Sequence, residues 1–194
     1  MRSLRRFLLA AAVAFAACAP AAGASERESV LWSALRGGGH AILLRHALAP
    51  GTGDPPGFRL DDCGTQRNLS NEGRAQAAAI GKAFRDNGVP VGRVLTSQWC
   101  RCRETAVLLA LGPVEDYPAL NSFYSDRSSA EEQTAALARF VGGPIEGPNI
   151  ILVTHQVNIT ELTGVFPSSG EAVVVRPDGK GSFVVVGRLL IMFK

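Results

Sequence analysis

Residues 41–46 read Ala-Ile-Leu-Leu-Arg-His, a short apolar run that ends in two basic side chains. A segment rich in glycine and proline follows at once, from Ala47 to Arg67. The apolar run predicts a buried strand, and the Gly/Pro-rich segment predicts a long loop. Ligands of α/β proteins bind at the carboxyl ends of parallel strands. We therefore expect Arg45 and His46 at a ligand-binding edge of a sheet, beneath a functional loop.

Further strands alternate with helices along the rest of the chain. The last two β-rich runs, 172–176 and 182–190, flank Pro-Asp-Gly-Lys-Gly, which predicts a β-hairpin. The other strands are predicted at 40–45, 93–97, 114–118 and 149–154, and the helices near 25–36, 70–87, 100–109, 128–141 and 156–163. This order predicts an α/β fold, a three-layer α/β/α domain with a mostly parallel sheet and an antiparallel C-terminal hairpin at its edge.

The first 24 residues are expected to be a signal peptide and to lie outside the fold. Three arginines precede an Ala/Leu-rich apolar run (residues 7–17), and Ala22-Gly23-Ala24 fits a small-x-small cleavage site. The apolar run is shorter than the roughly 20 residues that a membrane-spanning helix needs. The predicted organisation is a signal peptide (1–24) followed by a single domain (25–194).

The leader predicts export, so the domain is expected to be periplasmic or secreted. The tetrapeptide Phe-Ala-Ala-Cys at residues 15–18 is a poor lipoprotein box, and it leaves open a lipid anchor at Cys18. In an oxidising compartment Cys63 is expected to pair with Cys100 or with Cys102. A metal site is the alternative for the Cys-x-Cys pair, but none of the three histidines has ligand spacing to these thiols.

The basic net charge of the chain belongs to the leader. The sequence has 20 basic and 17 acidic residues, and Arg2, Arg5 and Arg6 are three of the 20. Residues 25–194 therefore balance at 17 against 17. This balance gives no basis for a nucleic-acid surface, so nucleic acid is not expected among the partners.

Three predicted strands end in polar residues that carry chemistry. They end in Arg45-His46, in Thr96-Ser97 and next to His155, and Arg101 lies in the first turn of the helix that follows Ser97. Parallel strands bring their carboxyl ends to one edge, so these groups are expected to converge. Two histidines, two arginines and helix N-termini around one crevice suit a small, doubly charged anion such as phosphate.

These residue types predict phosphoryl-transfer chemistry. A neutral imidazole can attack phosphorus and form a phosphohistidine, which water then hydrolyses. Arginines stabilise the charge on the phosphoryl oxygens during transfer, and a second histidine can bridge those oxygens. A carboxylic acid or another donor must protonate the leaving alcohol.

Five motifs carry these residues: Leu-Arg-His-Ala at 44–47, Arg-Asn-Leu-Ser-Asn-Glu-Gly-Arg-Ala-Gln-Ala at 67–77, Thr-Ser at 96–97 with Arg101, Glu-Thr-Ala at 104–106, and Val-Thr-His at 153–155. In order and spacing they resemble the histidine phosphatase (phosphoglycerate-mutase-like) superfamily, and together with the leader they suggest an exported bacterial member. The resemblance covers nearly all of residues 25–194. It implies that His46 is the phosphorylated nucleophile and that Arg45, Arg101 and His155 complete the phosphate pocket. Arg67 or Asn68 is expected to line its wall.

The sequence departs from the superfamily pattern at position 47 and in the motif that usually carries the acid. Alanine stands at position 47, where the superfamily usually has glycine, so the turn after His46 must form without glycine's conformational freedom. No segment matches the usual acid-bearing glutamate motif. Asp126 is the first candidate for the proton donor because it precedes a helix in the matching region, and Glu131, Asp61 and Asp62 are alternatives.

The sequence thus predicts a metal-independent, acid-type phosphatase that hydrolyses phosphomonoesters through phospho-His46. No cofactor is expected, and the substrate is expected to be a phosphorylated small molecule or envelope component. Two alternatives remain from other classes. One is a phosphate-recognising binding protein without turnover, and the other is a phosphomutase of the same superfamily.

Overall fold

The computed structural model describes residues 22–192 of the chain. Residues 1–21 of the predicted signal peptide (1–24) lie outside this range. Its last three residues, 22–24, belong to the start of helix α1 (Ala22–Arg36). No helix in residues 22–192 combines the length and apolar character required to cross a membrane.

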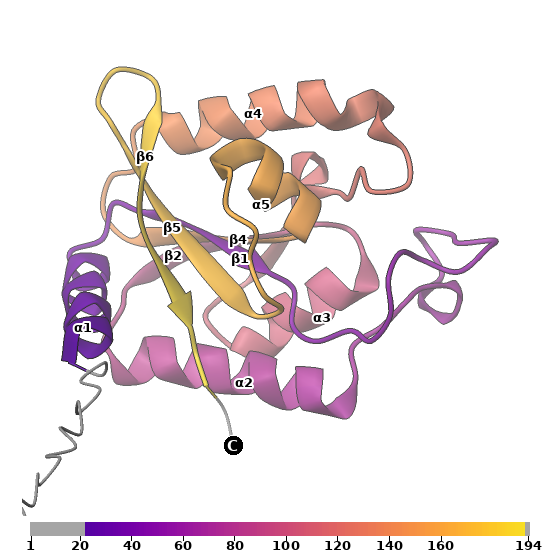
Figure 1. The fold of residues 1–194 in the computed structure, drawn as a ribbon, viewed down its shortest axis with the longest axis horizontal. Coiled ribbons are helices and arrows are strands. Elements are labelled where there is room, and N and C mark those ends of the chain that lie inside the picture. The colour runs from indigo at the N-terminus through magenta and orange to yellow at the C-terminus, as the bar shows by residue number, and fades with distance from the viewer. Residues whose placement is uncertain (1–21, 193–194) are drawn as a thin grey trace, which may run out of the picture.

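The fold is built on one six-stranded sheet with the order β3-β2-β4-β1-β5-β6 (Figure 1). The parallel part of the sheet consists of β1 (Ala41–Arg45), β2 (Val91–Thr96), β3 (Val114–Asp116) and β4 (Asn149–Thr154). In this part β4 pairs with β1 and with β2, and β2 also pairs with β3. Strand β5 (Glu171–Pro177) pairs antiparallel with β1, and β6 (Phe183–Leu190) pairs antiparallel with β5 at the edge. The predicted fold class, with its C-terminal hairpin, is confirmed.

Helices cover both faces of the sheet, which makes three layers (Figure 1). Helices α1, α2 (Asn71–Asp86) and α3 (Cys100–Leu109) pack on one face, and α4 (Ala130–Gly142) and α5 (Gln156–Thr163) pack on the other. Short 3-10 turns are η1 (Cys63–Thr65), η2 (Pro118–Leu120) and η3 (Arg127–Ser129).

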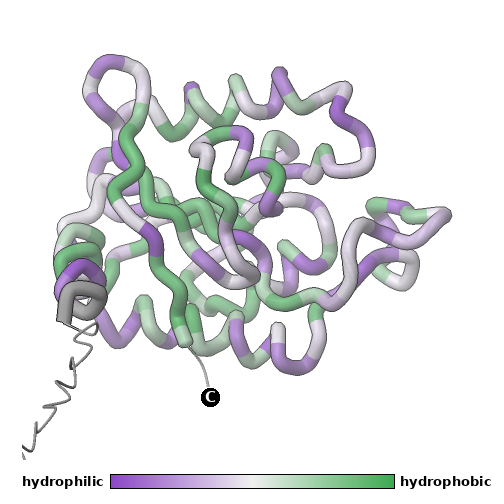
Figure 2. The backbone as a smooth tube through the Cα atoms, viewed as in Figure 1, coloured by the Kyte–Doolittle hydropathy of each residue, from purple (hydrophilic) through white to green (hydrophobic). Residues whose placement is uncertain are grey.

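Strand β1 shows why the opening apolar run decides the fold. Its side chains alternate between the faces, so Ile42 and Leu44 join the core under α1, α2 and α3, whereas Ala41 and Leu43 join the core under α4 and α5. A strand buried on both faces needs a continuous apolar sequence rather than an alternating one. Figure 2 shows hydrophobic colour along the strands in the middle of the sheet, β4, β1 and β5.

Two glycines allow helix α2 to lie close to its neighbours. A Cβ atom on Gly73 would lie 2.0 Å from the Leu48 carbonyl oxygen, and one on Gly81 would lie 1.9 Å from that of Leu109. The predicted cap is also present, since Ser70 Oγ accepts a hydrogen bond from the Gly73 N–H at 3.1 Å. Helix α2 therefore packs directly against the segment that leaves β1.

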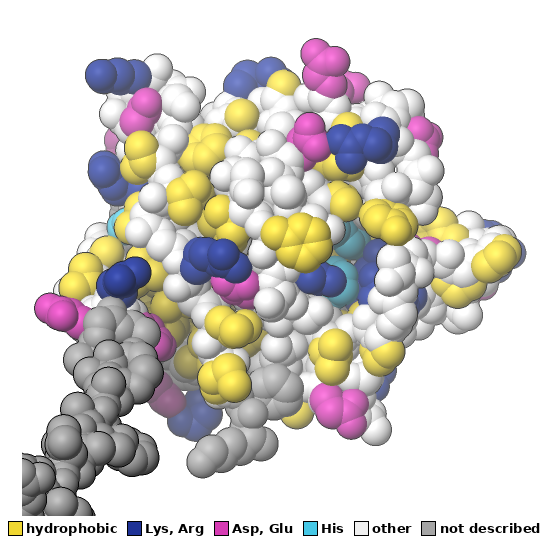
Figure 3. Space-filling model, viewed as in Figure 1, with side chains coloured by type: hydrophobic (Ala, Val, Ile, Leu, Met, Phe, Trp, Pro, Cys, Tyr) yellow, Lys and Arg dark blue, Asp and Glu magenta, His cyan; other side chains and the backbone are white. Residues whose placement is uncertain are grey.

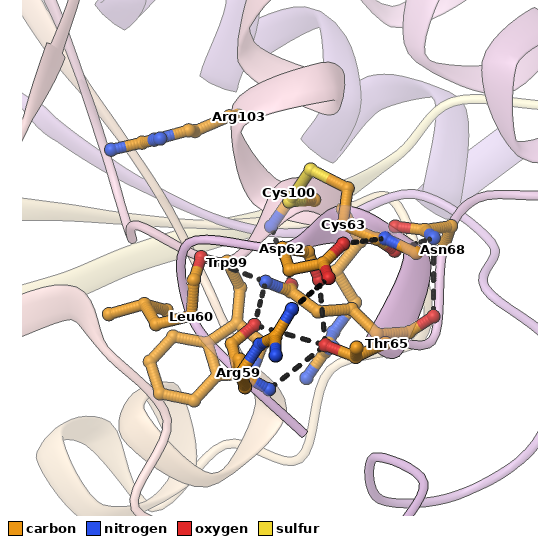
Figure 4. The surroundings of a disulfide bond; sticks show 12 residues. Arg59, Leu60, Asp62, Cys63, Thr65, Asn68, Trp99, Cys100 and Arg103 are labelled. Carbon is orange, nitrogen blue, oxygen red and sulfur yellow. Dashed lines mark hydrogen bonds and ion pairs between the residues drawn. A yellow bond between two sulfur atoms is a disulfide. The ribbon is translucent and has the colours of Figure 1, made fainter. Parts of the chain in front are cut away.

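The β1–α2 loop (residues 46–70) is tied to helix α3 by a disulfide. Cys63 in η1 is bonded to Cys100, the first residue of α3, and Cys102 is a buried free thiol. The structure thus resolves the open pairing in favour of Cys63–Cys100 (Figure 4). Because Arg101 follows Cys100 directly, the bond places the loop beside that arginine.

Candidate active site

The polar strand ends meet at one edge of the sheet. Strand β4 lies between β1 and β2, and its register pairs Thr154 with Arg45 and Val153 with Thr96. The His46 N–H donates to the Thr154 carbonyl at 2.9 Å. The rings of His46 and His155 lie edge to face with their centroids 5.5 Å apart. The predicted convergence of these two histidines is present in the structure.

His46 is held as a neutral imidazole with a defined tautomer. Its ring is 2% exposed, and Nδ1 lies 2.8 Å from the Ala47 carbonyl oxygen. A carbonyl only accepts hydrogen bonds, so Nδ1 carries the proton and the lone pair is left on Nε2. Burial, followed by the positive charge of Arg101, lowers the pKa of His46 to about 3. The ring therefore remains a potential nucleophile at neutral pH.

Alanine at position 47 is compatible with the turn after His46. Among residues 22–192, Ala110 is the only non-glycine residue with a positive φ, so the backbone of Ala47 does not use the left-handed region. The Ala47 N–H donates to Thr105 Oγ1 at 3.1 Å. The glycine usual in the superfamily is not required here.

His155 precedes helix α5 and faces His46 from strand β4. Its Nε2 lies 2.9 Å from Ser97 Oγ, and its Nδ1 lies 3.5 Å from Arg101 Nη2. Since a guanidinium only donates, Nδ1 accepts and Nε2 carries the proton that it donates to Ser97. Burial, then the neighbouring His46 and Arg101, lower the pKa of His155 well below its usual value.

The positively charged side chains of Arg45, Arg67 and Arg101 lie around the same cavity as the two histidines. Arg45 Nη1 donates to the Pro167 carbonyl at 2.9 Å, and Arg67 Nε donates to the Gly53 carbonyl at 2.7 Å. Burial, then repulsion from Arg101, lowers the pKa values of both Arg45 and Arg67. The Nε groups of Arg45 and Arg101 are buried without a hydrogen-bond partner. Buried, unpaired cationic donors indicate a site built for an anion.

These groups surround a small cavity of about 90 Å³. Figure 3 shows histidine side chains beside Lys and Arg side chains in a hollow of the visible face. Pockets that enclose a drug-sized ligand measure roughly 300–1,000 Å³, so this one suits a single oxyanion group. It is lined by Arg45, His46, Gly51, Thr52, Gly53, Asp54, Arg67, Arg101, Ser122, Tyr124, His155, Gln156 and Val157.

Five predicted site residues line this cavity, and two do not. Those that line it are Arg45, His46, Arg67, Arg101 and His155. Asn68 instead braces the β1–α2 loop, because its amide donates to the carbonyl oxygens of Cys63 (2.7 Å) and Gln66 (3.2 Å) (Figure 4).

The predicted proton donor, Asp126, lies outside the cavity. Its Oδ1 accepts the Ser128 N–H at 2.9 Å and thereby caps η3. Hydrogen bonds from Ser128 lower the pKa of this exposed carboxyl. The alternatives Glu131, Asp61 and Asp62 do not line the cavity either. Asp62 pairs with Arg59 and caps η1 (Figure 4).

The carboxylate that does reach the cavity is Asp54, which sequence reasoning missed. It forms a two-pronged ion pair with Arg101, with Oδ1 2.6 Å from Nη1 and Oδ2 3.2 Å from Nη2. Oδ2 also accepts the Trp99 indole N–H at 3.0 Å, and Oδ1 accepts the Arg67 backbone N–H at 3.2 Å. Burial raises the pKa of Asp54, but the bonds and charge of Arg101 outweigh it and lower the pKa overall.

The chemistry available here is that of an anion site with a nucleophile. Within residues 22–192, no three His, Cys, Asp or Glu side chains are grouped as metal ligands. The positive charge comes from guanidinium groups, which are suited to the oxygens of phosphate.

Comparison with known proteins agrees with this geometry. The family model for the histidine phosphatase superfamily (branch 1) matches residues 41–124, a span that contains His46, Asp54, Arg67 and Arg101. The resemblance of the sequence to this superfamily is thereby confirmed. No curated protein sequence matches the chain significantly.

Solved structures share the fold at low sequence identity. The protein histidine phosphatase SixA bound to tungstate has a TM-score of 0.54 at 16% identity, over 77% of this chain and 96% of that one. A mycobacterial glucosyl-3-phosphoglycerate phosphatase bound to VO3 has a TM-score of 0.53 at 16% identity, over 75% and 96%. A mutant phosphoserine phosphatase from Entamoeba histolytica bound to phosphoserine has a TM-score of 0.51 at 13% identity, over 77% and 95%.

Proposed function

We propose that this histidine phosphatase superfamily domain hydrolyses phosphomonoesters through a covalent phosphohistidine at His46. The observation that carries the proposal is the cavity itself. A neutral imidazole with its lone pair on Nε2 lies among three arginines, of which Arg101 is buried and Arg45 and Arg67 are partly buried. The Nε–H groups of Arg45 and Arg101 are unpaired. This combination of a nucleophile and unsatisfied cationic donors fits attack on a phosphoryl group better than it fits passive anion binding.

In the proposed first step, Nε2 of His46 attacks phosphorus while the bond to the leaving oxygen breaks. The Nδ1–H bond to the Ala47 carbonyl holds the ring in the reactive tautomer and stabilises the positive charge that develops on it. Arg45, Arg67 and Arg101 bind the equatorial phosphoryl oxygens, which carry the charge in the transition state. Water then hydrolyses the phosphohistidine and restores His46.

His155 is proposed to bind the phosphoryl group with the arginines. In the free site its Nδ1 accepts from Arg101 and its Nε2 is hydrogen-bonded to Ser97. A dianion that occupies the cavity favours the protonated ring, which then donates from Nδ1 to a phosphoryl oxygen. The charge is supplied by arginine and histidine, so the proposed reaction is metal-independent.

The test is to trap the intermediate. Enzyme mixed with ³²P-labelled aryl phosphate and quenched should yield a phosphoenzyme that is labile to acid and stable to alkali, as a phosphohistidine is. His46→Ala should abolish both the label and the turnover. His40→Ala is the matched control, since His40 lies just before strand β1, at the end opposite His46, with Nδ1 2.7 Å from the Gly38 carbonyl oxygen, and it should retain the label. Normal turnover by His46→Ala would reject the mechanism.

Substrate identity and cellular location are part of the same proposal. The cavity encloses only a phosphoryl group, so we infer a substrate whose alcohol part lies outside it, a phosphorylated small molecule or envelope component. Export to the periplasm, with a lipid anchor at Cys18 as a further option, is supported by the leader sequence and by the Cys63–Cys100 bond, since disulfides form and persist in oxidising compartments. Cell fractionation of the full-length chain tests this location.

A further inference from the structure

Asp54 occupies the donors that a phosphoryl group needs. Both of its carboxylate oxygens lie against Arg101, whose Nη2 is also 3.5 Å from Nδ1 of His155. The Arg101 side chain is 3% exposed and that of Asp54 is 12% exposed, so the ion pair is nearly buried. A bound phosphoryl group must therefore share Arg101 with this carboxylate or displace it.

We propose that Asp54 is the proton donor to the leaving oxygen and that substrate binding releases it from Arg101 for this task. The inference rests on the phosphatase function proposed above and identifies its missing acid. Asp54 is the carboxyl group that lines the same cavity as His46, whereas Asp126, Glu131, Asp61 and Asp62 do not.

The position of Asp54 suits a leaving group that extends out of the cavity. A second hollow of about 510 Å³ adjoins the first. Asp54 and Ser122 line both hollows, whereas Asp126 lines only the second. One wall of the second hollow is formed by Phe58 and Trp99, whose rings stack with centroids 5.2 Å apart. The phosphoryl group fills the small cavity and the alcohol lies in the larger hollow, so Asp54 stands at the boundary where the bond between them breaks.

Without substrate, the groups around Asp54 favour its ionised form. A bound phosphoryl group reverses the balance of charges around this carboxyl. Arg101 from α3, Arg67 from the loop and the Trp99 indole all face the carboxylate in the free site, and Arg45 lies across the cavity. A phosphoryl dianion takes over the arginine charges and places negative charge next to a poorly hydrated carboxyl. Both effects favour the protonated form.

When substrate displaces Asp54 from Arg101, the ionised carboxylate takes up one proton from solvent, and the proton balance of the reaction is then complete with this residue. The N–P bond forms from the lone pair of His46 Nε2, and the P–O electron pair passes to the leaving oxygen, which takes the proton of Asp54. In the second step the Asp54 carboxylate takes a proton from the attacking water while the N–P pair returns to His46. Release of phosphate lets Asp54 lose that proton and return to Arg101.

The experiment compares two substrates that differ in their need for an acid. Benzyl phosphate releases a strongly basic alkoxide, and 4-nitrophenyl phosphate releases a stable phenolate. The parameter is kcat/KM, because it reports the steps up to departure of the alcohol. Asp54→Asn should lower kcat/KM for benzyl phosphate by about 10²–10⁴-fold, the usual contribution of general acid catalysis, and that for 4-nitrophenyl phosphate less than tenfold. Asp86→Asn, at an exposed carboxylate paired with Lys82, is the matched control.

The outcomes separate this inference from the proposed function. Equal losses on both substrates would show that Asp54 only positions Arg101, and a selective loss in Asp126→Asn instead would assign the acid to Asp126. Either result overturns the inference. The His46 mechanism still stands if the same variant yields a labelled phosphoenzyme. Failure to trap label in the wild type would reject the mechanism itself. The melting temperature and vanadate binding of Asp54→Asn show that a selective loss is not misfolding.

Discussion

Acid should destabilise this protein through its buried histidines, and His46 allows the effect to be calculated. Its pKa is about 3 in the folded chain, against 6.5 for the free side chain, because burial and Arg101 disfavour the charged ring. The unfolded chain therefore binds more protons than the folded one between these values, and the free energy of unfolding falls as the pH drops from 6.5 toward 3. Between pH 7 and pH 4.5 the two-state linkage gives a loss of roughly 2–3 kcal/mol from His46 alone.

Urea unfolding at pH 7 and at pH 4.5 measures this loss. The lower pH lies between the two pKa values of His46, and the pKa values of Asp54 and Glu171 are lowered, so these carboxylates lose their charge at lower pH than unperturbed carboxyl groups do. His46→Asn removes the titrating ring, and its amide can still donate to the Ala47 carbonyl. The pH-dependent loss in this variant should be smaller than that of the wild type by roughly 2–3 kcal/mol. Equal losses in the two proteins, or an NMR signal of the His46 ring that titrates near pH 6.5, would refute the reasoning.

Three further predictions follow from specific contacts. Arg101→Lys loses the two-pronged guanidinium geometry and should lower kcat/KM for benzyl and 4-nitrophenyl phosphate alike, by at least about 10²-fold, unlike the selective effect expected for Asp54→Asn. The double variant Cys63→Ser/Cys100→Ser removes a bond that spans 37 residues and should lower the free energy of unfolding by about 2–4 kcal/mol in urea, and also the activity, because the loop then loses its tie to α3. Gly73→Ala places a Cβ 2.0 Å from the Leu48 carbonyl and should destabilise the fold by about 1–3 kcal/mol in the same assay, despite the higher helix propensity of alanine.

The fold was predictable because its signals are local and mutually consistent. The run 149–154 predicted β4 with its observed bounds, and the run 100–109 did the same for α3. Pro-Asp-Gly-Lys-Gly marked the hairpin because its turn chemistry lies in adjacent residues, and Asp178 accepts hydrogen bonds from the Lys180 and Ser182 N–H groups within it. In each case one short window contains the whole physical cause.

The histidines and arginines of the site were predictable for a related reason. Except for Arg67, which lies in the β1–α2 loop, each lies at or next to the end of a strand or helix, and the parallel sheet then fixes where those ends meet. Asp54 lies in the β1–α2 loop and is not next to the end of a strand or helix. Its position depends on Arg101, 47 residues away in the sequence, and on a loop whose course is set by the Cys63–Cys100 bond. Asp126 was predicted from a local signal, its position before a helix, and in the structure it caps η3.

The arrangement of charges around the cavity explains why such a site can exist in a stable fold. Buried like charges repel, and Arg101 lowers the pKa values of Arg45, Arg67 and both site histidines. Asp54 is the counter-ion that offsets part of this repulsion, and breaking a buried ion pair at one partner leaves a buried charge unpaired. A phosphoryl dianion neutralises the same arginines more completely, so it can replace the carboxylate without leaving that charge unpaired. The group that stabilises the free site thus becomes available as an acid only when substrate has taken its place.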